Sequence, residues 1–231
     1  MNDAYVVSAV RTPVAKAFKG GFRNTRPDDL LAHVIREAMA EVPEIDGAEV
    51  EDVIVGCAMP EAEQGMNVAR IGSLLAGLPD NVPGATVNRF CSSGLQTVAM
   101  AADRIRLGEA DIMIAGGTET MTMVPMMGHK VAMNPRVFED DNIGIAYGMG
   151  ITAEKVSEKY NVSREDQDQF GYQSHQKAIR AIDTGEFTEI RPYTVASHQP
   201  DFNSGAIREL ETVIDTDEGP RRDTTPEALG K

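Results

Sequence analysis

Apolar residues follow two alternating patterns through the first 120 residues of the chain. Continuous apolar runs predict buried strands, and apolar residues three and four positions apart predict amphipathic helices. The predicted strands lie at residues 5–10, 53–58, 85–90 and 111–116. The predicted helices lie at residues 27–38, 68–75 and 91–107. This alternation is typical of an α/β layer built around a largely parallel sheet.

The pattern loses its regularity after the fourth predicted strand. Methionines crowd residues 121–133, and residues 186–220 are polar and punctuated by prolines, so no element is assigned to them. One long helix is predicted at residues 163–185. The sequence therefore predicts an α/β domain at residues 1–120 and a helix-containing insertion domain, or loop domain, at residues 121–231.

The last residues carry the start of another helix. Thr225 has the character of an N-cap, Pro226 occupies the first helical position, and Glu227 places an acid in the first turn. The sequence stops at Lys231, about one turn later, and an isolated one-turn helix is not stable. We therefore expect the sequence to stop inside an element, which implies a truncated insertion domain.

Cys91 stands at the joint between the third predicted strand and the helix that follows it. The first N–H groups of a helix are unpaired, and the positive end of its dipole favours an anion such as a thiolate. The small residues Ser92, Ser93 and Gly94 follow the cysteine, so a bulky acyl group could reach the sulfur. The residues alone leave two interpretations open, a buried core thiol and a reactive nucleophile.

The second cysteine, Cys57, falls in a predicted buried strand and is interpreted as a packing residue. We expect no disulfide between the two cysteines, because the chain has the character of a soluble protein from a reducing compartment, the cytoplasm. His33 lies beside an apolar helix face and is predicted to be structural, whereas His175 is predicted to be solvated. No metal site is expected.

Charge narrows the classes of partner. The 231 residues include 22 basic and 36 acidic ones, giving a formal net charge of −14. This balance argues against nucleic acid and against an anionic membrane surface, since both require clustered Lys and Arg. No apolar run is long enough to span a bilayer, so no membrane span is expected.

Three motifs resemble those of the thiolase family. The segment from Asn88 to Gln96, NRFCSSGLQ, resembles the nucleophile motif of thiolases. The segment Gly116–Thr122, GGTETMT, resembles the family's Gly-Gly-x-Glu-x-Met-Ser/Thr motif, and Met149–Glu154 resembles a block in its loop domain. The motifs occur in family order, and the resemblance covers essentially the whole chain.

The resemblance implies an acetyl-CoA acyltransferase, or 3-ketoacyl-CoA thiolase, with a layered α/β fold of which this chain is one half. Cys91 is then the nucleophile that carries an acyl-cysteine intermediate, and its backbone N–H is one oxyanion donor. The activating histidine, a second cysteine and further oxyanion donors belong to a C-terminal half that is absent here. We therefore expect little or no turnover from this chain alone.

The resemblance also implies coenzyme A and acyl-CoA as substrates, with no bound cofactor. Arg221 is the candidate for the adenine end, Thr225 is a second candidate, and Met149 matches a position that lines the acyl channel. Family members are homodimers or homotetramers. The residues near Asn88 and Thr122 favour degradative members, which points to fatty acid metabolism and β-oxidation.

Three alternatives to this function remain. A 3-ketoacyl synthase also places a cysteine at a strand-to-helix joint, although the segment Asn88–Phe90 and Glu119 fit thiolases better. A non-catalytic or split half could bind CoA or a partner subunit, because the expected base is missing. A redox thiol protein fits poorly, since Cys57 lies on another predicted strand.

Overall fold

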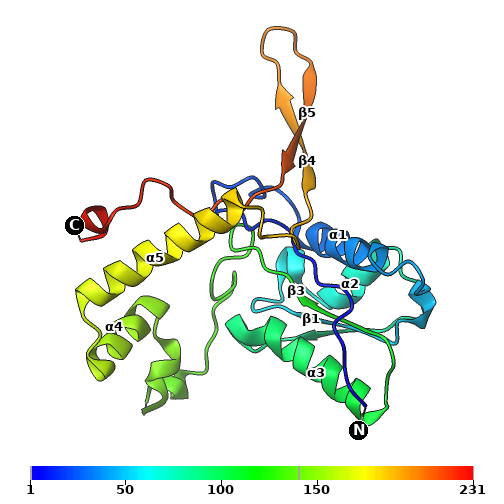
Figure 1. Cartoon of the computed structure of the whole chain (residues 1–231), viewed down its shortest axis with the longest axis horizontal. Coiled ribbons are helices and arrows are strands. Elements are labelled where there is room, and N and C mark those ends of the chain that lie inside the picture. Colours follow the sequence, from blue (N-terminus) through cyan, green and yellow to red (C-terminus); the bar gives the residue numbers. More distant parts are fainter. Residues whose placement is uncertain (1, 140, 231) are drawn as a thin grey trace. The chain divides into compact units, whose positions relative to one another are not determined.

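The computed structural model describes residues 2–139 and 141–230 (Figure 1). Contacts divide the chain into two compact units. The first unit contains the residues up to 129 together with residues 189–219, and the second contains residues 130–188 and the residues from 220 onward. The expected boundary after residue 120 stays a prediction, but the unit division shows that residues 189–219 return to the first unit.

A three-stranded parallel sheet organises the first unit. Its strands are β1 (Asp52–Gly56), β2 (Gly84–Val87) and β3 (Met113–Gly117), in the spatial order β2-β1-β3. Both neighbours run parallel to β1, with Val55 opposite Thr86 on one side and Gly116 on the other. The predicted α/β class with a parallel sheet is confirmed, and the carboxyl ends of all three strands meet at one edge.

Three helices cover this sheet. They are α1 (Pro27–Ala40), α2 (Val68–Leu75) and α3 (Ser93–Leu107), close to the predicted ranges. In Figure 1, α1 and α2 lie on one face of the sheet and α3 lies on the other. Asn67 caps α2, and Gly108 ends α3 in the left-handed conformation that favours glycine. The core between the layers is apolar and includes Leu31, Ile35, Val50, Val53, Val55, Val68 and Val82.

The predicted first strand at residues 5–10 is wrong. This segment forms no strand, and Tyr5, Val6 and Val7 are 77%, 77% and 68% exposed. Its apolar run joins no ladder, and β3, which pairs with β1 on one side, is left as an edge strand of the three-stranded sheet. A single parallel bridge between Arg11 and Ile190 is the only isolated pairing found among the described residues.

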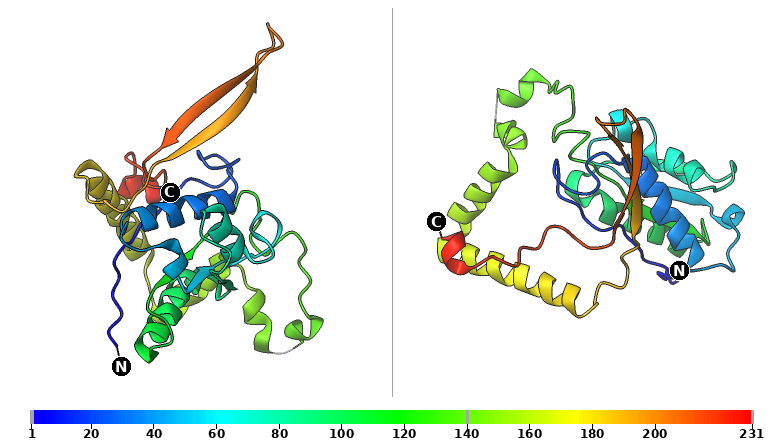
Figure 2. Two further views of the ribbon diagram at one scale, coloured as in Figure 1. Left: turned by 90° about the vertical axis from the view of Figure 1, so that its right-hand side faces the viewer. Right: turned by 90° about the horizontal axis from the view of Figure 1, so that it is seen from above.

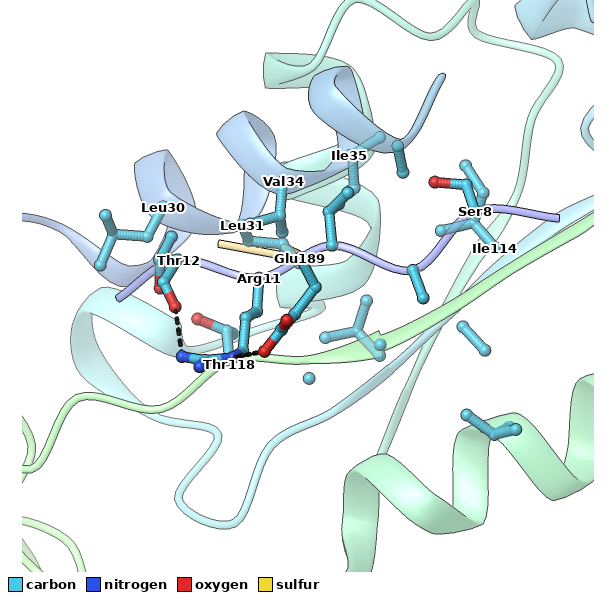
Figure 3. Close-up of a pocket in the computed structure, with 18 of the residues that line it drawn as sticks. Ser8, Arg11, Thr12, Leu30, Leu31, Val34, Ile35, Ile114, Thr118 and Glu189 are labelled. Carbon is cyan, nitrogen blue, oxygen red and sulfur yellow. Dashed lines mark hydrogen bonds and ion pairs between the residues drawn. The ribbon is translucent and has the colours of Figure 1, made fainter. Parts of the chain in front are cut away.

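A cavity of about 480 Å³ opens beside this extended segment (Figure 3). Its walls are mostly apolar side chains from α1 and β3, such as Leu31, Ile35 and Ile114. Arg11 closes one part of it through an ion pair of 2.9 Å with Glu189. The extended segment therefore lies over an incompletely filled space and is not packed against the sheet.

The return segment forms a β-hairpin that the sequence did not predict. Strands β4 (Tyr193–Pro200) and β5 (Ile207–Ile214) pair antiparallel over eight residues each and run out as a twisted ribbon (Figure 2, left). The hairpin begins at Tyr193, whose ring meets Phe22 and His33 edge-on at 5.8 and 5.1 Å. This aromatic contact anchors the hairpin and gives His33 the predicted structural role.

The second unit is helical. It contains α4 (Met149–Tyr160), α5 (Arg164–Asp183) and α6 (Pro226–Leu229), and α6 lies along α5 (Figure 2, right). Ser163 caps α5, as predicted, and Thr225 caps α6. Arg164 on α5 donates a hydrogen bond to the carbonyl of Leu229. This tertiary contact supplies the stability that a single turn lacks in isolation.

Short 3-10 helices complete the description. They are η1 (Gly47–Glu49), η2 (Ala62–Gln64), η3 (Phe90–Ser92), η4 (Pro135–Phe138) and η5 (Asp141–Ala146). No helix of the described residues is long and apolar enough to cross a membrane.

Candidate active site at Cys91

Cys91 lies in η3, between the end of β2 and the start of α3. This is the strand-to-helix joint that the sequence predicts. The side chain is exposed and the thiol is free. Of the two interpretations left open by the residues, the buried core thiol is therefore wrong, and the sulfur is accessible to a substrate.

A strained turn presents the cysteine. Phe90 has a φ of 47°, in a region that bulky residues rarely occupy. Two side chains hold this turn. The Phe90 N–H donates to Asn88 Oδ1 at 2.9 Å, and the buried Ser93 hydroxyl donates to the Phe90 carbonyl at 2.6 Å. Local strain of this kind concentrates at functional sites.

The start of α3 packs closely against the ends of β1 and β3. A Cβ placed on Gly56 would lie 2.6–2.7 Å from backbone atoms of Ser93 and Gly94, and one on Gly117 would lie 3.7 Å from the Gly94 Cα. The ends of β2 and β3 are not adjacent to each other, because β1 lies between these two strands. The approach arises because Gly56 on that middle strand has no side chain.

Side chains beyond the strand ends connect the three loops. The Ala58 N–H donates to Glu119 Oε2 at 2.7 Å, and Asn88 Nδ2 donates to the Ala58 carbonyl at 3.0 Å. Gln64, which is fully buried, donates to Glu119 and accepts the Thr120 N–H at 3.0 Å. The motif glutamate therefore ties the loops after β1 and β3 together.

Cys57 has the opposite environment to Cys91. Its residue is 1% exposed, and its N–H donates to the Val87 carbonyl at 3.0 Å. Burial, followed by the negative charge of Glu119, raises the pKa of the Cys57 thiol to about 12. The predicted packing role of Cys57 is confirmed, and both cysteines are free, as expected.

No histidine among the residues that the structure describes forms a hydrogen bond with Cys91. The His33 ring packs edge-on against Tyr193. His129 lies in a loop, and its backbone N–H donates a hydrogen bond to the Glu61 carboxylate. His175 is half-buried, and its Nδ1 accepts the Arg221 N–H at 3.1 Å, so it is not the freely solvated side chain that the sequence predicts. A base for Cys91 is therefore not provided by the described part of the first unit.

The other candidate residues all belong to the second unit. Arg221 bonds through its backbone to His175, Thr225 Oγ1 accepts the Ala228 N–H at 3.1 Å, and Met149 begins α4 with 59% of its surface exposed. Cys91 belongs to the first unit. Within residues 2–139 and 141–230, no group of three or more His, Cys, Asp or Glu residues is placed to hold a metal ion.

Residues 4–231 match the family model described as the N-terminal domain of thiolase. The chain belongs to the thiolase family. It is 47% identical over 236 residues to a 3-ketoacyl-CoA thiolase of Bacillus subtilis (strain 168), covering 99% of this chain and 58% of that protein. It is 42% identical to a β-ketoadipyl-CoA thiolase of Acinetobacter baylyi, covering 100% of this chain and 59% of that protein.

A solved structure agrees with this assignment. The crystal structure of the Bacillus anthracis acetyl-CoA acetyltransferase superimposes with a TM-score of 0.80 at 34% identity, covering 100% of this chain and 58% of that one. The thiolase-like fold is thereby confirmed. The chain spans a little under three-fifths of the length of the relatives that it matches.

The 480 Å³ cavity of this thiolase domain is not lined by Cys91. Its charged lining residues are Arg11, Glu119 and Glu189, and Figure 3 shows Arg11 directed at Glu189 and the Thr12 carbonyl. The cavity and the cysteine are thus separate features. Sequence reasoning also missed the roles of Gln64 and Asn88, although Asn88 lies inside the nucleophile motif and its Asx turn to Phe90 is a pattern typical of asparagine.

Proposed function

We propose that this chain carries the acyl-accepting cysteine of a thiolase. The Cys91 sulfur attacks the 3-keto carbonyl of a 3-ketoacyl-CoA, the bond between C2 and C3 breaks, and acetyl-CoA leaves after protonation. The acyl group then passes from Cys91 to the thiol of a second coenzyme A. The reverse sequence of steps forms the 3-ketoacyl-CoA.

One observation carries this proposal, the exposed thiol of Cys91 on a strained turn directly before α3. Its approach is kept open by glycine and serine, and the N-terminus of α3 stabilises negative charge there. The Cys91 N–H is one oxyanion donor in this proposal. Several relatives are named 3-ketoacyl-CoA thiolase, and these names support 3-ketoacyl-CoA as the substrate class.

For coenzyme A, we propose Arg221 at the adenine end, with Thr225 and Met149 as further contacts. The chain has a net charge of −14, so a polyanionic substrate needs local cations. The Thr225 hydroxyl caps α6, so in this proposal Thr225 shapes the site and does not bind coenzyme A through its hydroxyl. Coenzyme A and acyl-CoA act as substrates here and not as resident cofactors.

The finer assignments follow the same proposal. We place the protein in the cytoplasm, as a homodimer or homotetramer, and in the degradative direction of fatty acid metabolism, β-oxidation. The residues near Asn88 and Thr122 support the degradative direction. Turnover by the isolated chain is expected to be very low, because no described histidine contacts Cys91.

Acyl capture tests the proposal directly. The purified 231-residue chain is incubated with acetoacetyl-CoA or acetyl-CoA, quenched in acid, digested and examined by mass spectrometry. An acetyl group on Cys91, absent in Cys91→Ser and retained in Cys57→Ser, is the expected result. Failure to acylate Cys91 in a folded chain would refute the proposal.

Turnover is measured in the same samples by thiolytic cleavage of acetoacetyl-CoA. Stoichiometric acylation without turnover is the expected outcome. Multiple turnovers that Cys91→Ser abolishes would overturn the expected inactivity of the isolated chain, while leaving the role of Cys91 intact.

A second candidate is a non-catalytic or split half that binds coenzyme A or a partner subunit. The absence of a histidine contact to Cys91, among the described residues, favours it. Coenzyme A binding by calorimetry that persists in Cys91→Ser, without acylation of the unmodified chain, would support this candidate over the first.

A further inference from the structure

The backbone of Ala58, just after β1, is held on both sides of its Cα. The Ala58 N–H donates to Glu119 Oε2 at 2.7 Å, and the Ala58 carbonyl accepts from Asn88 Nδ2 at 3.0 Å. Glu119 follows β3 and Asn88 follows β2, so the backbone of this one residue connects the loops beyond all three strands. A bond to an ionised carboxylate is stronger than a neutral one, which makes the Glu119 contact the firmer side of this clamp.

Gln64 fixes the Glu119 carboxylate in this position. It is 0% exposed, and its amide donates to Glu119 and, at 2.9 Å, to the Met59 carbonyl. Its oxygen accepts the Thr120 N–H at 3.0 Å. A buried amide with this set of partners has one satisfied orientation. Gln64 therefore determines where the second oxygen of Glu119 meets the Ala58 N–H.

The Asn88 side chain links the backbone of Ala58 to the Asn88–Phe90 turn that precedes Cys91. Its Nδ2 is fixed by the Ala58 carbonyl, and its Oδ1 accepts the Phe90 N–H at 2.9 Å. An asparagine side chain whose two ends are both bonded has one rotamer available. The bond to Phe90 is the one that holds the unfavourable φ of 47° directly before Cys91.

We propose that Glu119 and Gln64 are positioning residues for Cys91, acting through the backbone of Ala58 and the side chain of Asn88. This inference rests on the proposed acyl transfer at Cys91, which it deepens. Neither residue touches the sulfur. Their effect is to keep the Asn88–Phe90 turn in the single conformation that directs the Cys91 thiol and N–H toward one acyl carbonyl.

Positioning has a specific signature at a reactive thiol. Capture of an acyl group needs the sulfur and the oxyanion donor in one geometry, and a misplacement of about 1 Å can cost about 10²-fold in rate. Alkylation by iodoacetamide needs only an accessible thiolate. Loosening the turn should therefore lower acylation much more than alkylation, whereas unfolding would expose Cys57 to the reagent.

The test compares four variants of the 231-residue chain with the unmodified protein. Glu119→Ala removes the carboxylate, Asn88→Ala removes both side-chain bonds, and Asn88→Ser keeps a short acceptor for the Phe90 N–H while losing the bond to Ala58. Glu44→Ala is the matched control, since it removes an exposed carboxylate that forms no hydrogen bond with the described residues of the turn. Amide hydrogen exchange is measured over residues 88–93, together with the rates of Cys91 acylation and alkylation.

We expect exchange at residues 88–93 to rise at least about 10-fold in Glu119→Ala and Asn88→Ala and less in Asn88→Ser. Acylation should fall by about 10–10² in the same order, with alkylation of Cys91 within about threefold of the unmodified chain. Glu44→Ala should match the unmodified chain. Cys57 should stay unlabelled in every folded variant.

Two outcomes overturn the inference. In one, exchange over residues 88–93 is unchanged in Glu119→Ala. In the other, acylation and alkylation fall together. Failure of the unmodified chain to acylate Cys91 counts against the proposed function instead, and the exchange measurement still decides whether Glu119 holds the turn.

Discussion

The two cysteines of this thiolase chain follow neighbouring strands and have opposite properties. Cys57 follows the middle strand β1, where helices cover both faces of the sheet, and its residue is 1% exposed. Cys91 follows the outer strand β2, and its side chain is exposed. Both lie at the carboxyl edge of one parallel sheet, so the edge alone does not produce a reactive thiol.

The difference arises from how the chain leaves each strand. After β1, the Cys57 N–H continues the sheet pairing by donating to the Val87 carbonyl. After β2, the Asn88–Phe90 turn breaks that pairing and enters α3 through a positive φ. One cysteine is thus held within the extended sheet and the other is lifted out of it. A strained turn, more than the position at a strand end, makes the Cys91 thiol accessible.

Alkylation tests this contrast with the largest expected effect. With a pKa of about 12, the Cys57 thiol is about 10⁻⁴ ionised at pH 8, and burial blocks the reagent as well. Iodoacetamide should therefore label Cys91 at least about 10³-fold faster than Cys57 in the native chain. Peptide mass spectrometry gives both rates, and a denatured sample should label both fully. Comparable native rates would contradict the contrast.

The raised pKa of Cys57 also predicts how stability depends on pH. The unfolded thiol has an ordinary pKa of 9.0, and folding raises the pKa to about 12. Between these values the unfolded state loses its proton first, so this contribution to stability is complete below pH 9 and declines as pH rises toward 12. The slope approaches about 1.4 kcal/mol per pH unit.

Urea unfolding at pH 8, 9.5 and 10.5 measures this decline. Cys57→Ala is less stable at pH 8 because it leaves a small cavity, but the difference from the unmodified chain should shrink as pH rises. A constant difference for Cys57→Ala would show that burial does not raise its pKa.

The sequence was sufficient for the elements whose signals are local. The apolar periodicity of residues 27–38, the cap before residue 164 and the Cys91 joint all appear in the structure near their predicted positions. These features depend on residues within one or two turns of each other. The family assignment rested on the same local motifs and is shown by the match over residues 4–231.

The failures concern relations between distant segments. The apolar run at residues 5–10 has the composition of a strand, but it joins no ladder, and β3 is left as an edge strand. The hairpin of β4 and β5 was missed because its strands carry charged and polar residues on both faces. The link from Glu119 through Ala58 to Asn88 spans three loops, and no single stretch of sequence contains it.

A smaller effect is expected at Gly56, which allows α3 to start beside β1. In Gly56→Ala, the new methyl group would lie within 2.7 Å of the backbone of Ser93 and Gly94. Neither the central strand nor the helix start can move freely, so we expect a loss of about 1–3 kcal/mol in the free energy of unfolding. Gly94→Ala, where a Cβ meets nothing within 4 Å, is the control. Equal stability of the two variants would show that the close approach is not required.

The smallest effect separates the two serines after Cys91. The buried Ser93 hydroxyl accepts the Arg89 N–H at 2.8 Å and donates to the Phe90 carbonyl at 2.6 Å. Ser93→Ala leaves that N–H without its acceptor and should cost about 1–2 kcal/mol. Ser92 is exposed and only donates to the Arg89 carbonyl, so Ser92→Ala should cost less than about 0.5 kcal/mol. Because both hydroxyls flank the same turn, a larger loss of thermal stability in Ser93→Ala attributes the stability of the turn to its buried side, whereas equal losses would show that the exposed hydroxyl of Ser92 contributes as much as the buried one.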